Sequence, residues 1–408
     1  MTARRTRANG EGSIFPYRNG YAAYVWVTKP DGLRTRKYVY GKTREVVHDK
    51  WVRLQAQAKA GPVATKVPTV AEFMAYWLAE VVGPNLAPLT YATYATLTRL
   101  YILPGLGPKR LDRLQVRDVQ TWINQAGRQC QCCTQGKDAQ RPAARQRCCA
   151  VGHCCGQTPS TNTISDLRKV LRSALSHAMT EELVGRNVAA LVKLPAVRKK
   201  RGQSWSSEEA RRFLESARRD GDPFYAGYVL VLVLGLRKGE VLGLVWDDLD
   251  FERAELTVGL QLQRVSRQLL HRETKTAHSD ATLPLPGLCV TALRLRQAGQ
   301  EKAKADAGKV WQADRLVFTT GLGTPIEPRN FNRSWDTRCR KAGVRKITVH
   351  DARRTCGSLL ADLDVHPRVA MTILRHARFA ITMEIYTQVS SKATQDALKR
   401  LGESLEGP

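Results

Sequence analysis

The sequence has 408 residues, and its 65 Lys and Arg against 37 Asp and Glu give a formal net charge of +28. A charge excess of this size indicates nucleic acid as the partner and disfavours an ordinary solvated surface, while the 43% apolar fraction is sufficient for the cores of two or three domains. A lipid motif, a membrane-spanning run of about 20 apolar residues and a signal-peptide core are all missing from the sequence, so we expect a cytoplasmic protein without a membrane partner.

Residues 1–62 predict a small basic domain of three strands and one helix. The strands, at residues 13–17, 21–28 and 34–40, are rich in aromatic and β-branched side chains. Asn19-Gly20 and the Gly32 turn separate them, and Thr43 caps a helix that reaches about Lys59. Basic and aromatic side chains of these strands are candidate DNA contacts, with ordinary sheet-surface roles as the alternative. They are Arg18, Tyr24, Trp26, Arg34, Arg36 and Lys37.

Residues 69–194 predict a mainly helical domain, which opens with the capping box Thr69-x-x-Glu72. The longest predicted helix covers residues 163–184, where apolar residues recur near helical spacing. These apolar residues are Ile164, Leu167, Leu171, Leu175 and Met179. Basic residues of the same helix are candidate phosphate contacts, with plain solvent exposure as the alternative. They are Arg168, Lys169 and Arg172.

An insertion at residues 129–157 contains seven of the ten cysteines and one histidine. The cluster comprises Cys130, Cys132, Cys133, Cys148, Cys149, His153, Cys154 and Cys155. In a reducing compartment, such clustering favours metal binding over disulfides, and thiolate and imidazole ligands suit tetrahedral zinc. The spacing differs from the usual zinc knuckle. A structural zinc site is therefore one hypothesis, and an oxidation-prone, partly disordered insertion is the other.

A basic linker at residues 195–204 precedes the last predicted domain, residues 205–408. An apolar run there ends in Gly235-Leu236-Arg237-Lys238-Gly239-Glu240. A guanidinium group at the edge of a buried helix is costly unless an anion binds it, and arginine grips a phosphate with two parallel hydrogen bonds. Three strand-like runs follow, at residues 255–258, 262–272 and 281–285, and Lys275 lies between the last two.

Further candidates for phosphate chemistry follow in the last 60 residues. His350 and Arg353 are three residues apart, so on a helix they share one face. Leu374-Arg375-His376 comes next, and Tyr386 lies ten residues after His376. The ordered set of Arg237, Lys275, His350-x-x-Arg353, His376 and Tyr386 resembles the active-site motifs of the tyrosine recombinases, the phage-integrase family.

This resemblance implies a role for each residue of the set. Arg237 and Arg353 would neutralise the phosphodiester, His376 would hydrogen-bond it, and Tyr386 would attack it to form a 3′-phosphotyrosyl link. Lys275 would be the general acid, and His350 would act as general base or bind the phosphate. Nearby cations are expected to favour the phenolate form of the tyrosine. The family often has glycine where this chain has Arg375, and commonly leucine where it has Ala352.

The resemblance also implies a multidomain fold that is mainly α with small β-sheets. It comprises a three-stranded arm-site DNA-binding domain, a helical core-binding domain and a mixed α/β catalytic domain with a C-terminal tail helix. Expected partners are double-stranded DNA at core and arm sites, three further protomers in a tetramer, and an excisionase or other directionality factor. Catalysis needs no cofactor. The alternatives are type IB topoisomerase-like or resolvase activity with the same chemistry, or a non-catalytic DNA-binding regulator.

Overall fold

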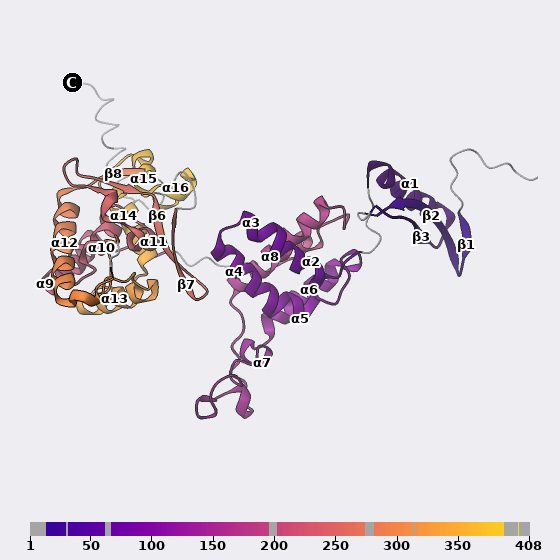
Figure 1. Ribbon diagram of the computed structural model, residues 1–408, viewed down its shortest axis with the longest axis horizontal. Coiled ribbons are helices and arrows are strands. Elements are labelled where there is room, and N and C mark those ends of the chain that lie inside the picture. The colour runs from indigo at the N-terminus through magenta and orange to yellow at the C-terminus, as the bar shows by residue number, and fades with distance from the viewer. Residues whose placement is uncertain are drawn as a thin grey trace, which may run out of the picture. The chain divides into compact units, whose positions relative to one another are not determined.

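The computed structural model describes residues 14–29, 32–61, 67–195, 202–273, 281–312, 315–386 and Lys399 (Figure 1). Helices predominate and the strands form small antiparallel sheets, so the expected fold class is confirmed. Residues 14–61, 67–195 and 202–386 each have their own apolar core. Within the described ranges, no helix is both long and apolar enough to cross a bilayer.

The first part is a three-stranded sheet with one helix packed on it. Strands β1 (Phe15–Tyr17), β2 (Gly20–Thr28) and β3 (Arg34–Gly41) pair antiparallel in chain order, as predicted. Helix α1 (Arg44–Ala60) begins after Thr43, whose hydroxyl accepts a hydrogen bond from the amide of Val46. Its Val47 and Trp51 pack against Ala23 to form a small core, which leaves the opposite sheet face uncovered.

The second part is helical. Its helices are α2 (Val70–Tyr76), η1 (Trp77–Val82), α3 (Gly83–Asn85), α4 (Pro88–Leu97), η2 (Thr98–Ile102), α5 (Leu103–Leu106), η3 (Leu111–Arg113), α6 (Val116–Arg128), α8 (Thr161–Thr180) and η6 (Val188–Leu191). Helix α8 buries Leu167, Leu171 and Leu175 as predicted. Met179 also lies on α8, but it is 40% exposed, and Ala178 is the buried residue of that turn.

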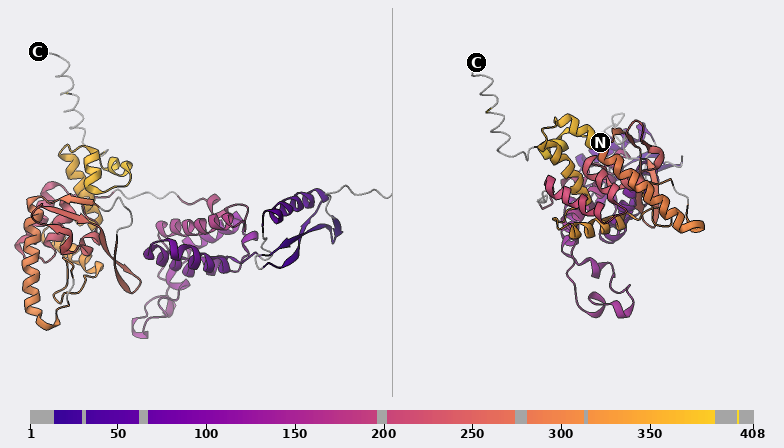
Figure 2. Two further views of the ribbon diagram at one scale, coloured as in Figure 1. Left: turned by 45° about the horizontal axis from the view of Figure 1, so that its top comes forward. Right: turned by 90° about the vertical axis from the view of Figure 1, so that its left-hand side faces the viewer.

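The cysteine-rich insertion projects from the adjacent ends of α6 and α8 (Figures 1 and 2). It contains only short elements, namely α7 (Gln131–Thr134), η4 (Ala143–Arg145) and η5 (Cys149–Val151). Its buried apolar cluster consists of Cys130, Cys132 and Cys148, with Cys149 packed against them. The insertion is thus built around sulfur atoms rather than around hydrocarbon side chains.

The third part surrounds the buried helix α10 with helices and small sheets. Its helices are α9 (Ser207–Arg219), α10 (Tyr225–Val233), α11 (Lys238–Gly243), η7 (Trp246–Asp248), α12 (Gly287–Ala307), η9 (Gly308–Val310), α13 (Pro328–Lys341), α14 (Val349–Asp362), α15 (Pro367–Leu374) and α16 (Phe379–Tyr386). Strands β4 (Leu249–Asp250), β5 (Glu255–Val258) and β8 (Ala281–Pro284) form one sheet.

The predicted single strand over residues 262–272 is a two-stranded hairpin. Strands β6 (Leu260–Val265) and β7 (Gln268–Glu273) pair antiparallel, and Ser266 turns the chain between them with φ of 52°. Sequence alternation does not reveal a tight turn that lacks glycine, proline or asparagine. Lys275 lies after β7, outside the described residues.

Candidate active site

A turn after the buried helix α10 places Arg237 at the start of α11. Gly235 makes this turn with φ of +59°, and a Cβ atom there would lie 2.6 Å from the side chain of Leu374. The next helix begins with Arg237 as its N-cap. The amide and the guanidinium group of Arg237 both donate to Glu240, over 2.9 and 2.6 Å. The Arg237 side chain remains 42% exposed, so its guanidinium group is both held and accessible.

Glu240 is a buried carboxylate shared by two arginines. One oxygen accepts from Arg237, and the other accepts from Arg375 over 2.6 Å. Burial alone would raise the pKa of Glu240, but the charges of Arg375 and Arg237 outweigh it and lower that pKa. The residue is therefore an ionised carboxylate that orients two guanidinium groups.

Arg375 is the member of this group whose contacts the sequence did not reveal. It adopts the left-handed conformation, with φ and ψ both 50°, that glycine adopts without strain. The backbone geometry expected of the family's glycine is thus present, and a buried arginine side chain comes with it. Its Nε–H has no hydrogen-bond partner among the described residues. Two features of the sequence could have indicated this contact: an arginine directly after an apolar helix, and a glutamate in the first arginine motif.

Arg353 lies on α14, next to the turn that Gly235 makes after α10. Its guanidinium group donates to the backbone carbonyls of Gly235 and Leu374, which joins α10, α14 and α15 at one point. Burial lowers the pKa of Arg353 to about 9, and the charges of Arg237 and Arg375 act in the same direction. Arg353 thus adds a third positive charge beside the two arginines that share Glu240, and a further anion would stabilise the cluster.

The neighbouring Arg354 was the rival for this role. Its guanidinium group lies 3.9 Å from the exposed carboxylate of Glu384 on α16, away from Glu240. Arg353 instead lines a cavity of about 460 Å³ together with Arg237 and His350. This arrangement supports the sequence-based choice of Arg353.

The two predicted histidines lie near these arginines. His350 is exposed at the first turn of α14, which begins with the capping box of Thr348 and Asp351. The Nδ1 atom of His376 is 3.0 Å from the hydroxyl of the buried Thr382. Burial, together with the charges of the three arginines and of His350, lowers the pKa of His376 to about 4. His376 is therefore neutral near pH 7 and able to donate a hydrogen bond without adding charge.

Tyr386 ends α16, and its hydroxyl group is engaged elsewhere. It donates a hydrogen bond to the carbonyl of Val365, between α14 and α15, over 2.7 Å. The expected stabilisation of its phenolate is absent in this arrangement, because burial raises the pKa of Tyr386 and Cys356 adds to the effect. The phenol is thus protonated and hydrogen-bonded to the backbone.

Comparisons with known proteins agree with this geometry. The phage integrase family model matches residues 204–393, and the model of the N-terminal SAM-like domain of phage integrases matches residues 69–126. A tyrosine recombinase XerC-like protein of Caldanaerobacter subterraneus is 26% identical over 396 residues, which cover 91% of this chain and 93% of that protein. An integrase of Streptomyces ambofaciens is 26% identical over 366 residues, covering 88% and 86%. The chain belongs to the phage integrase family.

The fold is shared with a solved integrase structure. A solved structure of the Tn1549 transposon integrase, in complex with a circular intermediate DNA, has a TM-score of 0.62 at 18% identity, and the match covers 82% of this chain and 99% of that one. This phage-integrase chain is thus a tyrosine-type site-specific DNA recombinase.

The candidate arm contacts of this integrase divide between two faces of the sheet. Tyr24 and Trp26 pair across the strands with Tyr38 and Arg36 on the face opposite α1. The Arg36 guanidinium lies over both rings, 4.9 and 4.8 Å from their centroids. Alternation along β3 places Arg34 on this face as well and Lys37 on the other.

The remaining arm candidate and those of α8 have different surroundings. Arg18 lies in the β1–β2 turn, 5.4 Å from the Tyr17 ring centroid. Arg168 is half-buried and donates to the carbonyl of Val192, so part of its hydrogen-bonding capacity serves the fold. Lys169 and Arg172 are exposed. The two latter side chains are therefore better placed to reach an external phosphate.

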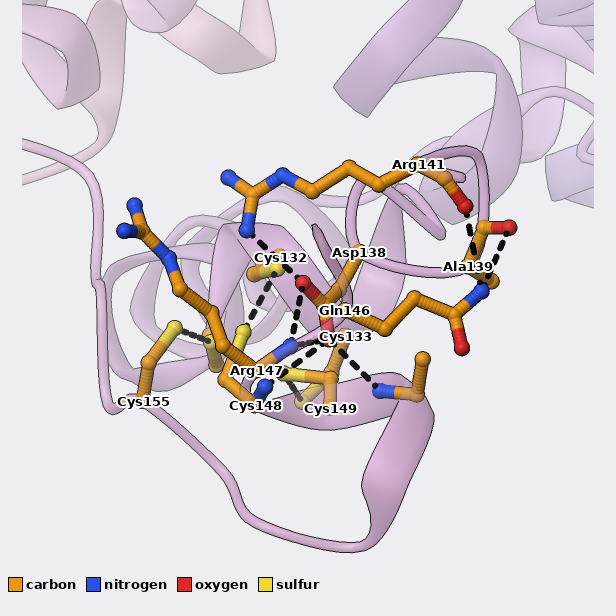
Figure 3. Close-up of polar contacts among 12 residues, drawn as sticks. Cys132, Cys133, Asp138, Ala139, Arg141, Gln146, Arg147, Cys148, Cys149 and Cys155 are labelled. Atoms are coloured by element: carbon orange, nitrogen blue, oxygen red, sulfur yellow. Dashed lines mark hydrogen bonds and ion pairs between the residues drawn. The ribbon is translucent and has the colours of Figure 1, made fainter. Parts of the chain in front are cut away.

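The seven clustered cysteines of the integrase meet in the insertion. Figure 3 shows Cys132, Cys133, Cys148, Cys149 and Cys155 among them. Their sulfur atoms form two groups of four in which every pair lies within 4.8 Å. The groups are Cys130, Cys133, Cys149, Cys154 and Cys132, Cys148, Cys149, Cys155. His153 is exposed and belongs to neither group, so the structure does not bring this predicted ligand to the sulfur atoms. The cluster is able to bind metal.

Proposed function

We propose that this integrase cuts and rejoins DNA strands through a covalent bond between Tyr386 and a 3′-phosphate. The observation that carries the proposal is the pairing of Arg237 and Arg375 with one buried carboxylate, Glu240, while the buried Arg353 next to them donates only to backbone carbonyls. Their surplus positive charge lies beside a cavity that is large enough for a phosphate group. A phosphodiester supplies the missing negative charge, and its transition state supplies more of it.

In the proposed mechanism, the guanidinium groups of Arg237 and Arg353 bind the non-bridging oxygens of the phosphate, and neutral His376 donates a further hydrogen bond. The Tyr386 oxygen attacks phosphorus while His350 accepts the phenolic proton. The bond from phosphorus to the 5′-oxygen breaks, and Lys275 protonates the leaving oxygen. Attack by a free 5′-hydroxyl group reverses these steps, and the phosphotyrosyl bond retains the energy of the original linkage, so no nucleotide is consumed.

A rearrangement of α16 is part of the same proposal. The Tyr386 hydroxyl must give up its hydrogen bond to the Val365 carbonyl before it attacks. Proximity of the arginines would then lower the pKa of the phenol and favour the nucleophilic phenolate. DNA binding is the event that we expect to promote this movement.

The proposed assembly follows from the same family chemistry. Two DNA duplexes exchange strands, so four protomers would act together in a cytoplasmic complex. The sheet face that carries Tyr24, Trp26 and Arg36 would bind arm-site DNA, and Lys169 and Arg172 would contact the core site. An excisionase or other directionality factor would select integration or excision.

The proposal assigns a structural rather than catalytic role to metal in the insertion. Thiolate sulfur atoms at short mutual distances suit zinc. A zinc ion would fix the insertion at the end of α6, and the strand-cleavage chemistry would proceed at the separate arginine site.

A suicide-substrate assay tests the nucleophile. The substrate is DNA that carries the attachment site and a nick near the scissile phosphate. After cleavage, the short fragment that bears the free 5′-hydroxyl group dissociates, so the strand cannot be rejoined and the covalent complex is trapped. Tyr386→Phe should abolish the trapped band and retain DNA binding in a mobility-shift assay. Tyr76→Phe is the matched control, because that exposed tyrosine contacts Glu181 and should trap normally. Trapping by Tyr386→Phe would refute the assignment.

A further inference from the structure

We propose that the cysteine-rich insertion holds two zinc ions that share the Cys149 thiolate. This inference deepens the proposed structural metal site and is independent of the strand-cleavage chemistry. Each four-sulfur group supplies the ligand number of a closed tetrahedral zinc site. The two groups together contain all seven cysteines of the insertion and have only Cys149 in common.

Two of the distances between sulfur atoms fit this arrangement, whereas the Cys133–Cys149 distance is shorter and the 3.6 Å Cys130–Cys155 contact joins the two groups. Four thiolates at the usual Zn–S distance of about 2.3 Å lie roughly 3.8 Å from one another at the corners of a tetrahedron. The Cys132–Cys148 and Cys133–Cys154 pairs, one from each group, are both 3.6 Å apart. Cys133 and Cys149 are 2.8 Å apart, and all seven cysteines are free thiols.

The order of cysteines along the chain explains why one ion is insufficient. Cys132 and Cys133 belong to different groups, and so do Cys154 and Cys155. The consecutive residues Cys154 and Cys155 are thus directed to different centres. Cys130 and Cys133 have Cys-x-x-Cys spacing within the longer Cys-x-Cys-Cys segment, and both residues belong to one group.

One carboxylate fixes the backbone around Cys148 and Cys149. Asp138 is fully buried and accepts hydrogen bonds from the amides of Arg147, Cys148 and Ala150 (Figure 3). Arg141 donates to the same carboxylate over 2.7 Å. This arrangement preorganises the shared cysteine without placing an acidic ligand among the sulfur atoms.

The insertion also needs a cross-link because it has little else to stabilise it. Cysteines supply its buried apolar cluster, and its one large aliphatic residue, Val151, is 50% exposed. Segments too small for a hydrocarbon core are usually held by disulfides or metals. Seven thiols cannot all pair as disulfides, and an enzyme that acts on intracellular DNA works where thiols stay reduced. Two zinc ions use every cysteine.

The charge of such a centre suits the insertion. Two zinc ions bring four positive charges against the negative charges of the seven thiolates, which leaves the cluster anionic. Lys137, Arg145 and Arg147 are the nearby cationic residues that offset it, and they carry no described ion pair to a carboxylate. The basic composition of this segment therefore complements the sulfur atoms at its centre.

The first test is the zinc content of the full-length untagged protein, purified without chelator and analysed by elemental analysis and native mass spectrometry. We expect two zinc ions per chain. One ion per chain would overturn the shared-ligand arrangement while retaining a zinc site. Absence of zinc would overturn both, and a native mass lower by pairs of hydrogen atoms would identify disulfides as the cross-link.

Single substitutions assign the ligands under mild chelator competition. Cys154→Ser and Cys155→Ser each affect one group and should leave one ion bound, whereas Cys149→Ser should lose both. His153→Ala and Cys289→Ala are matched controls that should retain both ions, because His153 lies outside the groups and Cys289 lies in the core of residues 202–386. Retention of one ion by Cys149→Ser, or loss of metal from His153→Ala, would contradict the assignment.

Cadmium exchange of the wild-type protein provides a measurement that needs no variant. Two ions bridged by one sulfur should give two ¹¹³Cd resonances with scalar coupling between them. Uncoupled resonances, or a single resonance, would exclude the Cys149 bridge even if the insertion binds metal.

Discussion

The proposed catalytic centre and the cysteine-rich insertion are stabilised in opposite ways. The centre gathers Arg237, Arg353 and Arg375 from distant parts of the sequence and buries the last two next to the large aromatic and aliphatic core around α10. The insertion draws all its functional side chains from residues 130–155 and has almost no hydrocarbon core. A hydrophobic core can therefore support costly buried charge, whereas a segment without one depends on its ligands for order.

The largest expected effect separates two adjacent arginines of the catalytic centre. Arg353→Ala should lower the rate of covalent trapping by about 100- to 1,000-fold, as loss of a transition-state hydrogen-bond donor does. Arg354→Ala is the matched control and should change the rate little, because that guanidinium group faces Glu384. Single-turnover trapping of a suicide substrate measures both. Equal losses would mean that the arginine site is not where the phosphate binds.

Loss of the shared carboxylate should destabilise the region around α10. Glu240→Gln leaves Arg237 and Arg375 without their counter-charge in a buried position, which should cost about 3 kcal/mol of unfolding free energy. Urea unfolding of the full chain, followed by tryptophan fluorescence, measures the change. Glu384→Gln, at an exposed carboxylate, should be nearly neutral. An unchanged midpoint for Glu240→Gln would show that hydrophobic packing alone stabilises the site.

Acid should destabilise the catalytic centre in two stages. The pKa of His376 falls from 6.5 to about 4 on folding, so the unfolded chain binds the proton more readily. The contribution of neutral His376 to the free energy of unfolding is complete above pH 6.5 and disappears as the pH falls towards 4. Glu240, whose pKa is lowered from 4.5, keeps its contribution until more acidic pH. His376→Asn should flatten the stability profile between pH 6.5 and 4, and an unaltered profile would contradict the shift.

A smaller effect should separate backbone strain from charge pairing at Arg375. Both Arg375→Ala and Arg375→Gly remove the ion pair with Glu240, but only glycine adopts φ of 50° freely. The glycine variant should therefore be about 1 kcal/mol more stable than the alanine variant. Denaturant midpoints of the two proteins give the difference directly. A more stable alanine variant would indicate that the backbone leaves the left-handed region.

The smallest effect on global stability should come from removing metal. A chelator should expose residues 129–157 to proteolysis and leave the main unfolding transition almost unchanged, because the insertion shares no core residue with the helices that carry it. Limited proteolysis and calorimetry of the same sample distinguish the two effects. A large fall in the main transition temperature would mean that the insertion stabilises the whole helical part.

The sequence predicts this molecule best where the signal is local. The strands and helix of residues 14–61 and the caps at Thr43 and Thr69 were readable from short patterns, and so was the proposed order of active-site residues. The Ser266 turn was missed because it lacks glycine, proline and asparagine, the strongest turn signals. The contacts of Arg375 with Glu240 and of Tyr386 with Val365 join residues far apart in the chain, so no local pattern encodes them.

A backbone hydrogen bond of 2.8 Å from the Gln131 amide to the Gln157 carbonyl closes the base of the insertion. Chain ends that meet in this way allow a segment to be exchanged for a short turn without moving the helices on either side. The cysteine-rich unit is thus a self-contained cassette, one that recombination between genes can add or delete as a block, and its ancestry need not follow that of the enzyme around it.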